Sequence, residues 1–384
     1  MTYEFSLSDV AFLASAAGAE AIAAVDRLPL ISASYLADVR SARELVRERA
    51  SAVLETVLLR RRAVSKVDDP AGWLFTDLAL QQATPSPVAR HRALRFAGRD
   101  VHDVTCSVGV DLVALAAVAR RCVGSDVDPV RLAMARHNCE VAVIRADALR
   151  PVSRGTAVFA DPGRRDAAGR RRWRPSDFLP ALDALAQVYR GRDLAVKCAP
   201  GIDFDDVAWA GEVELVSLDG QVLEACLWTG SLAGVRRRAT VLRTGAPQWT
   251  VTDAEPDDCP VRPTGEWIID PDGAVVRAGL VRHYAAAHGL GQLDERIAYL
   301  TGDTPPPGIR AFRILEHGHY TEKSLRALLR RLGVGRVEIL VRGLDIDPNK
   351  LRPRLKLAGG AEASVVLTRI GRIPAMFVCR AERV

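Results

Sequence analysis

Acidic residues stand at the ends of four short apolar runs in the middle of the chain. Asp103 lies in the first run, and Asp126, Asp147 and Asp161 each come just after one of the next three. If these runs are parallel strands, their carboxyl ends meet at one edge of a sheet, where ligands of open α/β folds bind. The spacing therefore predicts a pocket surrounded by carboxylates.

The loop after the first run indicates which ligand that pocket takes. In Thr105-Cys106-Ser107-Val108-Gly109 there is one glycine, whereas a dinucleotide-binding loop has the pattern G-x-G-x-x-G. An acidic loop poor in glycine suits a cationic ligand without phosphate better than a pyrophosphate. We therefore predict S-adenosylmethionine as cofactor, with Asp103, Thr105, Ser107 and Gly109 in its binding loop. Asp103 is expected to hold the amino group, and Gly109 to allow close approach to the backbone.

The next two acidic residues are predicted to complete the cofactor site. Asp126 follows the glycine loop by about 20 residues, the usual position of a carboxylate that accepts ribose hydroxyls. Asp128 is better explained as the cap of a helix that begins at Pro129. Asp147 is expected to accept a hydrogen bond from the adenine amino group, although a lone aspartate after a strand is often a turn residue.

Asp161 and Pro162 are the predicted catalytic pair. Because proline fixes its own φ, a carboxylate beside a prolyl carbonyl presents two acceptors in a fixed geometry. Two acceptors can hold both hydrogens of an exocyclic amine and direct its lone pair at a methyl group. Asp-Pro alone is a common turn, but its position after three cofactor-type residues favours catalysis.

An arginine-rich segment follows the catalytic pair and predicts a nucleic-acid substrate. Residues 164–174 contain six arginines and Trp173. Cationic side chains that contact phosphates, together with stacking side chains, are what recognition of single-stranded RNA uses. We therefore predict Arg164, Arg165 and Trp173 as substrate-binding residues; the alternative is a solvated basic loop.

The pattern of apolar residues predicts three domains. Residues 1–95 have helical spacing, with candidate helices at 19–25, 36–64 and 76–96. Residues 96–245 alternate short apolar runs with helices, which is typical of a parallel sheet. The expected strands are 101–104, 122–125, 141–145, 157–160 and 194–197, and Ser176 is expected to cap a helix that ends at Tyr189. Asp219-Gly220 between two apolar runs then predicts a closing antiparallel hairpin.

Residues 246–384 are predicted to form a small C-terminal α/β domain. The segment opens with a Pro- and Asp-rich stretch at 253–263, which is typical of a linker. Expected strands lie at 312–315, 337–341, 365–368 and 375–379, and expected helices at 321–332 and 348–356. The fold class is therefore α/β, with a helical domain before the sheet and a smaller α/β domain after it.

The composition is that of an ordinary globular protein. The 384 residues carry a formal net charge of +6, which is compatible with an anionic partner but does not require one. The seven cysteines show no C-x-x-C spacing, so we expect neither a disulfide framework nor a zinc site, and the pair His317 and His319 has no evident third ligand. We find no signal peptide and no long apolar run, and predict a cytoplasmic protein that needs no membrane and no metal.

These motifs resemble those of known methyltransferases. The stretch from about 95 to 230 resembles the class I fold that uses S-adenosylmethionine, and Asp161-Pro162-Gly163-Arg164 resembles the Asp/Asn-Pro-Pro-aromatic motif of enzymes that methylate amino groups of nucleobases. Residues 73–76 and 82–84 are similar to the trimethylguanosine synthase branch, which methylates guanine N2. The segments 270–274 and 339–343, with Arg277, resemble a bacterial group that has a THUMP-like C-terminal domain.

The resemblance implies an RNA methyltransferase that acts on an amine of a tRNA or rRNA base, with guanine N2 favoured. The chain departs from the family pattern at Ser107, where a glycine is usual, and at Gly163 and Arg164, which replace a proline and an aromatic residue. The resemblance therefore implies that Arg164 stacks on the target base, since an arginine plane can do so, or that Trp73 or Trp173 takes the place of the aromatic residue. Two alternatives remain: an RNA-binding protein that has lost catalysis, and a methyltransferase acting on a protein or small molecule. A nicotinamide dehydrogenase is disfavoured by the glycine loop and by the closing hairpin.

Overall fold

The chain folds into two compact units. The computed structural model describes residues 3–164 and 174–384. The first unit contains Met1–Leu218, Leu223–Gly234 and Thr244–Ala246, and the second contains Asp219–Val222, Val235–Arg243 and Pro247–Val384. The sequence suggests boundaries at 95/96 and 245/246. The two compact units are divided differently, because the N-terminal helices and the sheet belong to the same unit.

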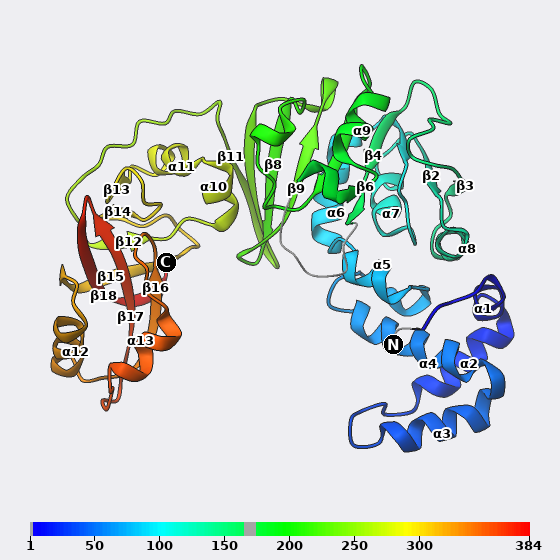
Figure 1. The fold of residues 1–384 in the computed structure, drawn as a ribbon, viewed down its shortest axis with the longest axis horizontal. Helices are drawn as coiled ribbons and strands as arrows, with labels where there is room; N and C mark the ends of the chain where they lie inside the picture. The colour runs from blue at the N-terminus through cyan, green and yellow to red at the C-terminus, as the bar shows by residue number, and fades with distance from the viewer. Residues whose placement is uncertain (1–2, 165–173) are drawn as a thin grey trace. The chain divides into compact units, whose positions relative to one another are not determined.

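Six helices precede the sheet of the first unit (Figure 1). They are α1 (Leu7–Leu13), α2 (Ala16–Asp26), α3 (Tyr35–Val46), α4 (Ala50–Ala63), α5 (Asp77–Gln82) and α6 (Ser86–Ala93). The single helix expected at 36–64 is interrupted at Arg47, whose φ of +48° is left-handed. The helix expected at 76–96 is interrupted before Pro85, because the residue before a proline disfavours helical backbone.

The sheet of the first unit has the predicted parallel strands and closing hairpin. Its strands are β1 (Asp100–Asp103), β2 (Arg121–Asp126), β3 (Ala142–Arg145), β4 (Ala157–Ala160), β7 (Leu194–Cys198), β8 (Glu212–Leu218) and β9 (Gln221–Trp228), in the order β3-β2-β1-β4-β7-β9-β8. The first five are parallel to one another, and β9 is antiparallel to β7. At the hairpin turn, Asp219 and Gly220 both have positive φ, as a tight two-residue turn requires.

Three helices connect the strands: α7 (Val110–Ala116), α8 (Pro129–Asn138) and α9 (Leu182–Val188). Asp128 caps α8 as predicted, since its carboxylate accepts from the amides of Val130 and Arg131. The helix cap predicted at Ser176 is wrong: residues 175–177 form a short 3₁₀ turn, and α9 begins only at Leu182. The reason is Pro180, which disfavours helical backbone at the residue before it. Instead β5 (Gly163–Arg164) pairs with β6 (Phe178–Leu179).

Large aromatic side chains pack together in the core around the sheet of the first unit. Every residue of β4 is buried, and Phe159 packs edge-on against Phe96, which also contacts Trp228 of β9. Gly124 of β2 has no room for a side chain, because a Cβ there would lie 2.7 Å from the Leu112 side chain of α7. This packing fixes the carboxyl ends of β1, β2 and β4.

The second unit is built on a seven-stranded sheet in the order β13-β14-β12-β15-β18-β17-β16. Its strands are β12 (Trp267–Ile269), β13 (Gly291–Gln292), β14 (Leu300–Gly302), β15 (Arg310–His319), β16 (Val334–Val341), β17 (Ala361–Ile370) and β18 (Ile373–Arg383), and β10 (Arg237–Arg243) and β11 (Ala246–Thr252) precede them. Its helices are α10 (Gly273–Ala278), α11 (Val281–Ala287), α12 (Glu322–Arg331) and α13 (Pro348–Arg354).

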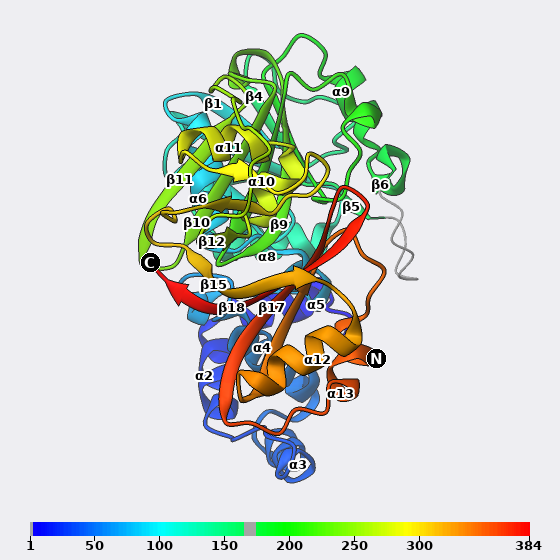
Figure 2. The same cartoon turned by 90° about the vertical axis from the view of Figure 1, so that its left-hand side faces the viewer.

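Figure 2 shows α12, α13, β17 and β18 in the second unit. The two helices share one hydrophobic cluster with these two strands. The expected C-terminal strands and helices are all present, and the strands extend further than the sequence indicates. The two C-terminal segments named for their resemblance also meet here: Arg342 donates to Asp270 at 2.8 Å, and its guanidinium lies over the Tyr299 ring.

Among the described residues, no single helix is long and apolar enough to cross a bilayer; α1 and α2 reach that length and apolarity only when taken together across an 80° bend. Within residues 3–164 and 174–384, no three His, Cys, Asp or Glu side chains are grouped as metal ligands would be.

Candidate active site

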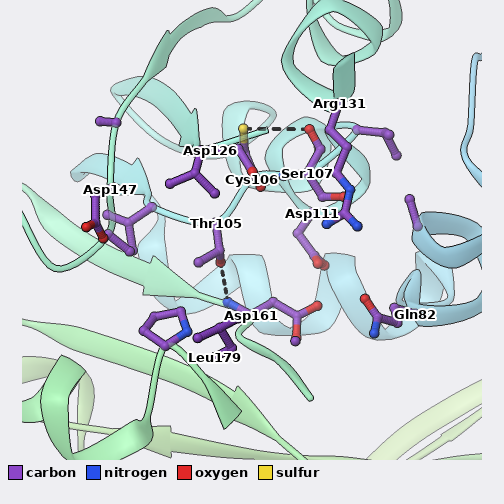
Figure 3. Close-up of a pocket in the computed structure, with 18 of the residues that line it drawn as sticks. Gln82, Thr105, Cys106, Ser107, Asp111, Asp126, Arg131, Asp147, Asp161 and Leu179 are labelled. Carbon is purple, nitrogen blue, oxygen red and sulfur yellow. Dashed lines mark hydrogen bonds between the residues drawn. The ribbon is translucent and has the colours of Figure 1, made fainter. Parts of the chain in front are cut away.

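A cavity of about 620 Å³ lies at the carboxyl ends of the parallel strands in the first unit (Figure 3). Its size is typical of a site for a small molecule or cofactor. Among the described residues, the charged side chains that line it are four carboxylates, Asp111, Asp126, Asp147 and Asp161, and one guanidinium, Arg131. Three of the four carboxylates are those that the sequence predicted to meet there.

The cavity lies where the order of the strands reverses, between β1 and β4. The backbone amide of Asp161 donates to Thr105 Oγ1 at 2.6 Å, and the amide of Val104 donates to the carbonyl of Phe159 at 2.9 Å. Figure 3 shows Asp161 beside Thr105 at this junction. The end of β4 is therefore fixed to the loop after β1, which is where a switch-point ligand binds.

In the loop after β1, Ser107 stands at the position where a glycine is usual and takes the left-handed backbone that glycine favours. Ser107 has a φ of +48°, and its amide donates to Asp126 Oδ2 at 3.0 Å. Gly109 has a φ of +97° and precedes the first residue of α7. A Cβ on Gly109 would lie 3.2 Å from Cys139 Sγ. Ser107 lines the cavity, whereas Gly109 does not.

Asp126 is held rigidly at the end of β2. It is 8% exposed; Oδ2 accepts from Ser107, and Oδ1 accepts from the amide of Asp128 at 2.9 Å. Each carboxylate oxygen has two lone pairs, so each keeps one for a ligand. Asp126 thus has the position and the acceptor capacity expected for binding a ribose diol.

The other two predicted cofactor carboxylates differ in exposure. Asp147 is exposed, lines the cavity and accepts from the amide of Leu149 at 2.9 Å. Asp103 is 1% exposed, does not line the cavity and accepts from the amide of Thr105 at 3.1 Å. Burial, together with the nearby carboxylate of Asp111, raises the pKa of Asp103 well above its ordinary value. Its direct contact with a cofactor amine stays a prediction.

Asp161 is the lining carboxylate that pairs with a lysine. Its side chain is 25% exposed, and Oδ2 accepts from Lys197 Nζ at 2.7 Å. Burial raises the pKa of Asp161, and the Lys197 ammonium partly offsets this effect. Burial alone would lower the pKa of Lys197, but Asp161, Asp111 and Glu224 outweigh it and raise that pKa. The two groups therefore form an ion pair at the wall of the cavity.

Pro162 is buried and does not line the cavity, whereas Gly163 does. Gly163 and Arg164 form β5, which places the segment after Asp161 beside Leu179 of β6 and leaves Leu179 at the edge of the cavity. The predicted role of the Pro162 carbonyl is not tested by this arrangement and remains a prediction.

The predicted substrate-binding residues are only partly placed. Arg165 and Trp173 lie outside the described residues, and Arg164 is described only through its backbone in β5. Trp73 stacks on Phe75 with ring centroids 5.7 Å apart and packs against the helical core. Trp73 does not line the cavity, so the structure does not bring it together with Asp161.

Sequence reasoning missed three charged residues at this site: Lys197, Asp111 and Arg131. Asp111 and Arg131 stand on α7 and α8 and line the cavity, and Lys197 lies near the end of β7. The available signal was a lysine within an otherwise apolar strand, since a buried charge needs a partner. The side chains of α5, including Gln82, close another side of the cavity (Figure 3).

Comparisons with known proteins agree with this geometry. The chain is 54% identical over 357 residues to an uncharacterized S-adenosylmethionine-dependent methyltransferase of Mycobacterium tuberculosis H37Rv, and equally to that of strain CDC 1551; each match covers 88% of this chain and 98% of the relative. The chain belongs to the S-adenosylmethionine-dependent methyltransferases. The acidic lining of the cavity fits their cofactor, because a sulfonium is cationic and carries no phosphate.

The other comparisons concern the fold and the terminal regions of this methyltransferase. A crystal structure from Porphyromonas gingivalis W83, assigned to the methyltransferases, matches 94% of this chain and 98% of its own with a TM-score of 0.74 at 20% identity. This similarity confirms the predicted fold class. Residues 309–381 match the model of the THUMP domain-like family, and residues 6–63 match a domain of unknown function.

Proposed function

We propose that this methyltransferase transfers a methyl group to an amine of an RNA base, with guanine N2 as the favoured position. The observation that carries the proposal is the placement of Asp161. Its backbone is fixed at the strand-order reversal by Thr105, and its carboxylate lines the same cavity as Asp126 and Asp147. A carboxylate acceptor beside a cofactor pocket is the arrangement needed to orient an amine.

The side chains of the cavity would act mainly by alignment. The amine lone pair forms a nitrogen–carbon bond as the carbon–sulfur bond of the donor breaks and its electron pair stays on sulfur. Asp161 accepts a hydrogen bond from the amine, stabilises the positive charge that develops on nitrogen and receives the proton that nitrogen releases. Alignment of two reactants contributes about 7–11 kcal/mol in well-oriented systems.

RNA as substrate is supported by the THUMP domain-like segment at 309–381 and by the arginines that follow Asp161 in the sequence. A base in a helix must first leave the stack, at a cost of a few kcal/mol. The apolar side chains of Leu78, Val127 and Leu179 line the cavity and are each at least 49% exposed. Such side chains would cover the faces of an unstacked base.

The first test is the substitution Asp161→Ala, measured by transfer of labelled methyl to RNA and by calorimetry of S-adenosylmethionine binding. We expect transfer to be abolished while the cofactor still binds, because Asp126 and Asp147 are unchanged. Asp100→Ala is the matched control: Asp100 lies at the amino end of β1, away from the cavity, and pairs with Arg120. Equal transfer by Asp161→Ala and the wild type would disprove the role of Asp161.

The second test is mass spectrometry of RNA nucleosides from cells with and without the gene, followed by methylation of the affected RNA in vitro. Loss of N2-methylguanosine supports the full proposal, and loss of another methylated amine corrects the position. RNA binding without transfer would indicate a protein that has lost catalysis. Transfer to a protein or small molecule, with no change in RNA, would overturn the proposed substrate.

A further inference from the structure

Lys197 is held by three acceptors, one of which is the cavity-lining carboxylate of Asp161. Its ammonium donates to Asp161 Oδ2 at 2.7 Å, to Thr84 Oγ1 at 2.8 Å and to the carbonyl of Gln82 at 3.4 Å. A lysine ammonium has three donors, so every N–H has a partner. With the side chain 13% exposed, Lys197 has little freedom to leave Asp161.

Further charges of alternating sign extend from Lys197 into the core. The Thr84 hydroxyl donates to Asp111 Oδ2 at 3.3 Å, and Asp111 pairs with Arg92. Arg92 is 2% exposed and donates to both oxygens of Glu224. Side chains from β7, α6, α7 and β9 and from the loops after α5 and β4 are thus joined in one network, which holds the Lys197 ammonium in place.

This network leaves Oδ1 as the freer acceptor of Asp161. Lys197 uses one of the two lone pairs of Oδ2, whereas Oδ1 accepts no hydrogen bond from the residues that the structure describes. Because Asp161 lines the cavity, Oδ1 is the acceptor open to an incoming amine. The orientation of that oxygen is set by the contact that Lys197 makes with the other one.

We propose that Lys197 is a positioning residue for methyl transfer: it fixes the carboxylate of Asp161 and keeps it ionised, so that Oδ1 accepts the hydrogen bond and the proton of the amine. The proposal rests on the proposed function, in which Asp161 receives the amine. It assigns to Lys197 no contact with the substrate. Charge is needed as well as length, since a neutral side chain would leave a partly buried carboxylate without a counterion.

The charged groups around Asp161 decide how its ionisation responds to the loss of Lys197. Lys197 faces it from β7, Asp111 from α7, Arg92 from α6 and Asp103 from β1. Burial and Asp111 favour the protonated carboxyl, and Lys197 is the largest of the effects that favour the carboxylate. Removal of Lys197 therefore raises the pKa of Asp161 further. A variant without the ammonium should regain activity as the pH rises.

The test compares Lys197→Met and Lys197→Arg with the wild type by the pH dependence of kcat for methyl transfer to RNA. For Lys197→Met we expect kcat to fall by about 100-fold near neutral pH. The acid limb of its pH profile, where kcat falls as Asp161 becomes protonated, should move to higher pH by about one unit or more, the usual effect of losing one close opposite charge. Lys197→Arg keeps the cation and should bring the limb back toward that of the wild type. Cofactor affinity, measured by calorimetry, should stay within about threefold.

Two further variants separate positioning from a merely structural role. Lys66→Met is the matched control, because Lys66 is a partly buried lysine that donates to the carbonyls of Leu80 and Gln81 and makes no bond to Asp161. Its acid limb should match that of the wild type. Thr84→Val removes one anchor of Lys197 but keeps its charge, and should shift the limb in the same direction by less. It provides the test if Lys197→Met does not fold.

An acid limb for Lys197→Met that coincides with that of the wild type would overturn the proposal, as would an equal loss of activity at every pH. If the wild type transfers no methyl group to RNA, the proposed function fails, and infrared spectroscopy then decides the role of Lys197. The protonated-carboxyl band that Asp161→Asn removes should titrate at higher pH in Lys197→Met than in the wild type. Identical titration of that band would disprove the role of Lys197 independently of any substrate.

Discussion

At the residue scale, Ser107 shows how a departure from a family motif is accommodated. The loop after β1 needs a left-handed residue at this position so that the amide can reach Asp126, and Ser107 takes that conformation with a φ of +48°. Left-handed backbone costs about 1–2 kcal/mol for a residue with a Cβ. The contact with Asp126 is therefore made at the expense of some stability, and the left-handed backbone at position 107 does not require a glycine.

The substitution Ser107→Gly is expected to stabilise the protein slightly. Glycine removes the left-handed penalty but loses about 0.5–1 kcal/mol of chain entropy on folding, so the net gain is about 0–1.5 kcal/mol. Chemical denaturation measures this difference, and calorimetry should show cofactor affinity close to that of the wild type, because the bond to Asp126 comes from the backbone. A loss of more than tenfold in affinity would mean that the serine hydroxyl itself contacts the cofactor.

The site residues that the sequence predicted are those whose position follows from a strand end. Asp126, Asp147 and Asp161 line the cavity because consecutive parallel strands end at one edge. Lys197 could not be assigned to Asp161 in this way, because their pairing depends on β7 lying next to β4, and this neighbour relation spans 36 residues. Asp103 is also at a strand end, but its side chain is buried and does not line the cavity. The sequence pattern does not determine whether a side chain at a strand end faces the cavity or the interior.

At the element scale, β1 is held to its surroundings by a buried histidine. His102 is 1% exposed; Nε2 hydrogen-bonds with Ser125 of β2 at 3.0 Å and Nδ1 with Ser153 at 2.8 Å. Burial, with a smaller contribution from Arg192, lowers the pKa of His102 to about 4. The neutral imidazole is thus part of the packing that positions the loop carrying Thr105 and Ser107.

This lowered pKa predicts a loss of stability in acid. An unfolded histidine titrates near pH 6.5, so the contribution of neutral His102 is fully present above that pH and is lost as the pH falls from about 6.5 to about 4. This difference between the pKa of His102 in the unfolded and folded protein corresponds to roughly 3 kcal/mol of unfolding free energy. Urea denaturation of the wild type and of His102→Gln at pH 7 and pH 4.5 measures it. The difference in unfolding free energy between the two proteins should shrink at the lower pH; a constant difference would exclude His102 as the source.

The element boundaries that the sequence failed to predict have local causes. The break between α3 and α4 could not be predicted from a glycine or proline, because the residue with left-handed backbone there is an arginine, Arg47. The break before Pro85 and the late start of α9 after Pro180 do have such a signal, since each proline restricts the residue before it. Apolar spacing continues across all three breaks, which is why periodicity alone predicted longer helices.

At the scale of the whole molecule, the cavity lined by Asp161 and the THUMP domain-like segment belong to different compact units. The second unit has two cavities of its own, of about 200 and 460 Å³, and Lys356 lines both. Arg330 lines the first and Arg352 the second. All three side chains are exposed, and neither Arg330 nor Lys356 makes an ion pair within the described part of the chain. Exposed cations beside hollows suit phosphate groups.

Replacing these three residues together, as Arg330→Gln, Arg352→Gln and Lys356→Gln, is expected to weaken RNA binding and leave cofactor binding unchanged. Removing one cation from a phosphate should reduce the slope of log affinity against log salt by about 0.7, so the slope of the triple variant should fall by about 2. Filter binding at several salt concentrations measures the slope. The matched control replaces Arg313, Arg372 and Arg380, which are exposed in the same unit and line neither cavity. If the control lowers the slope as much as the triple variant does, the effect comes from net charge, and the cavities of the second unit do not bind the RNA.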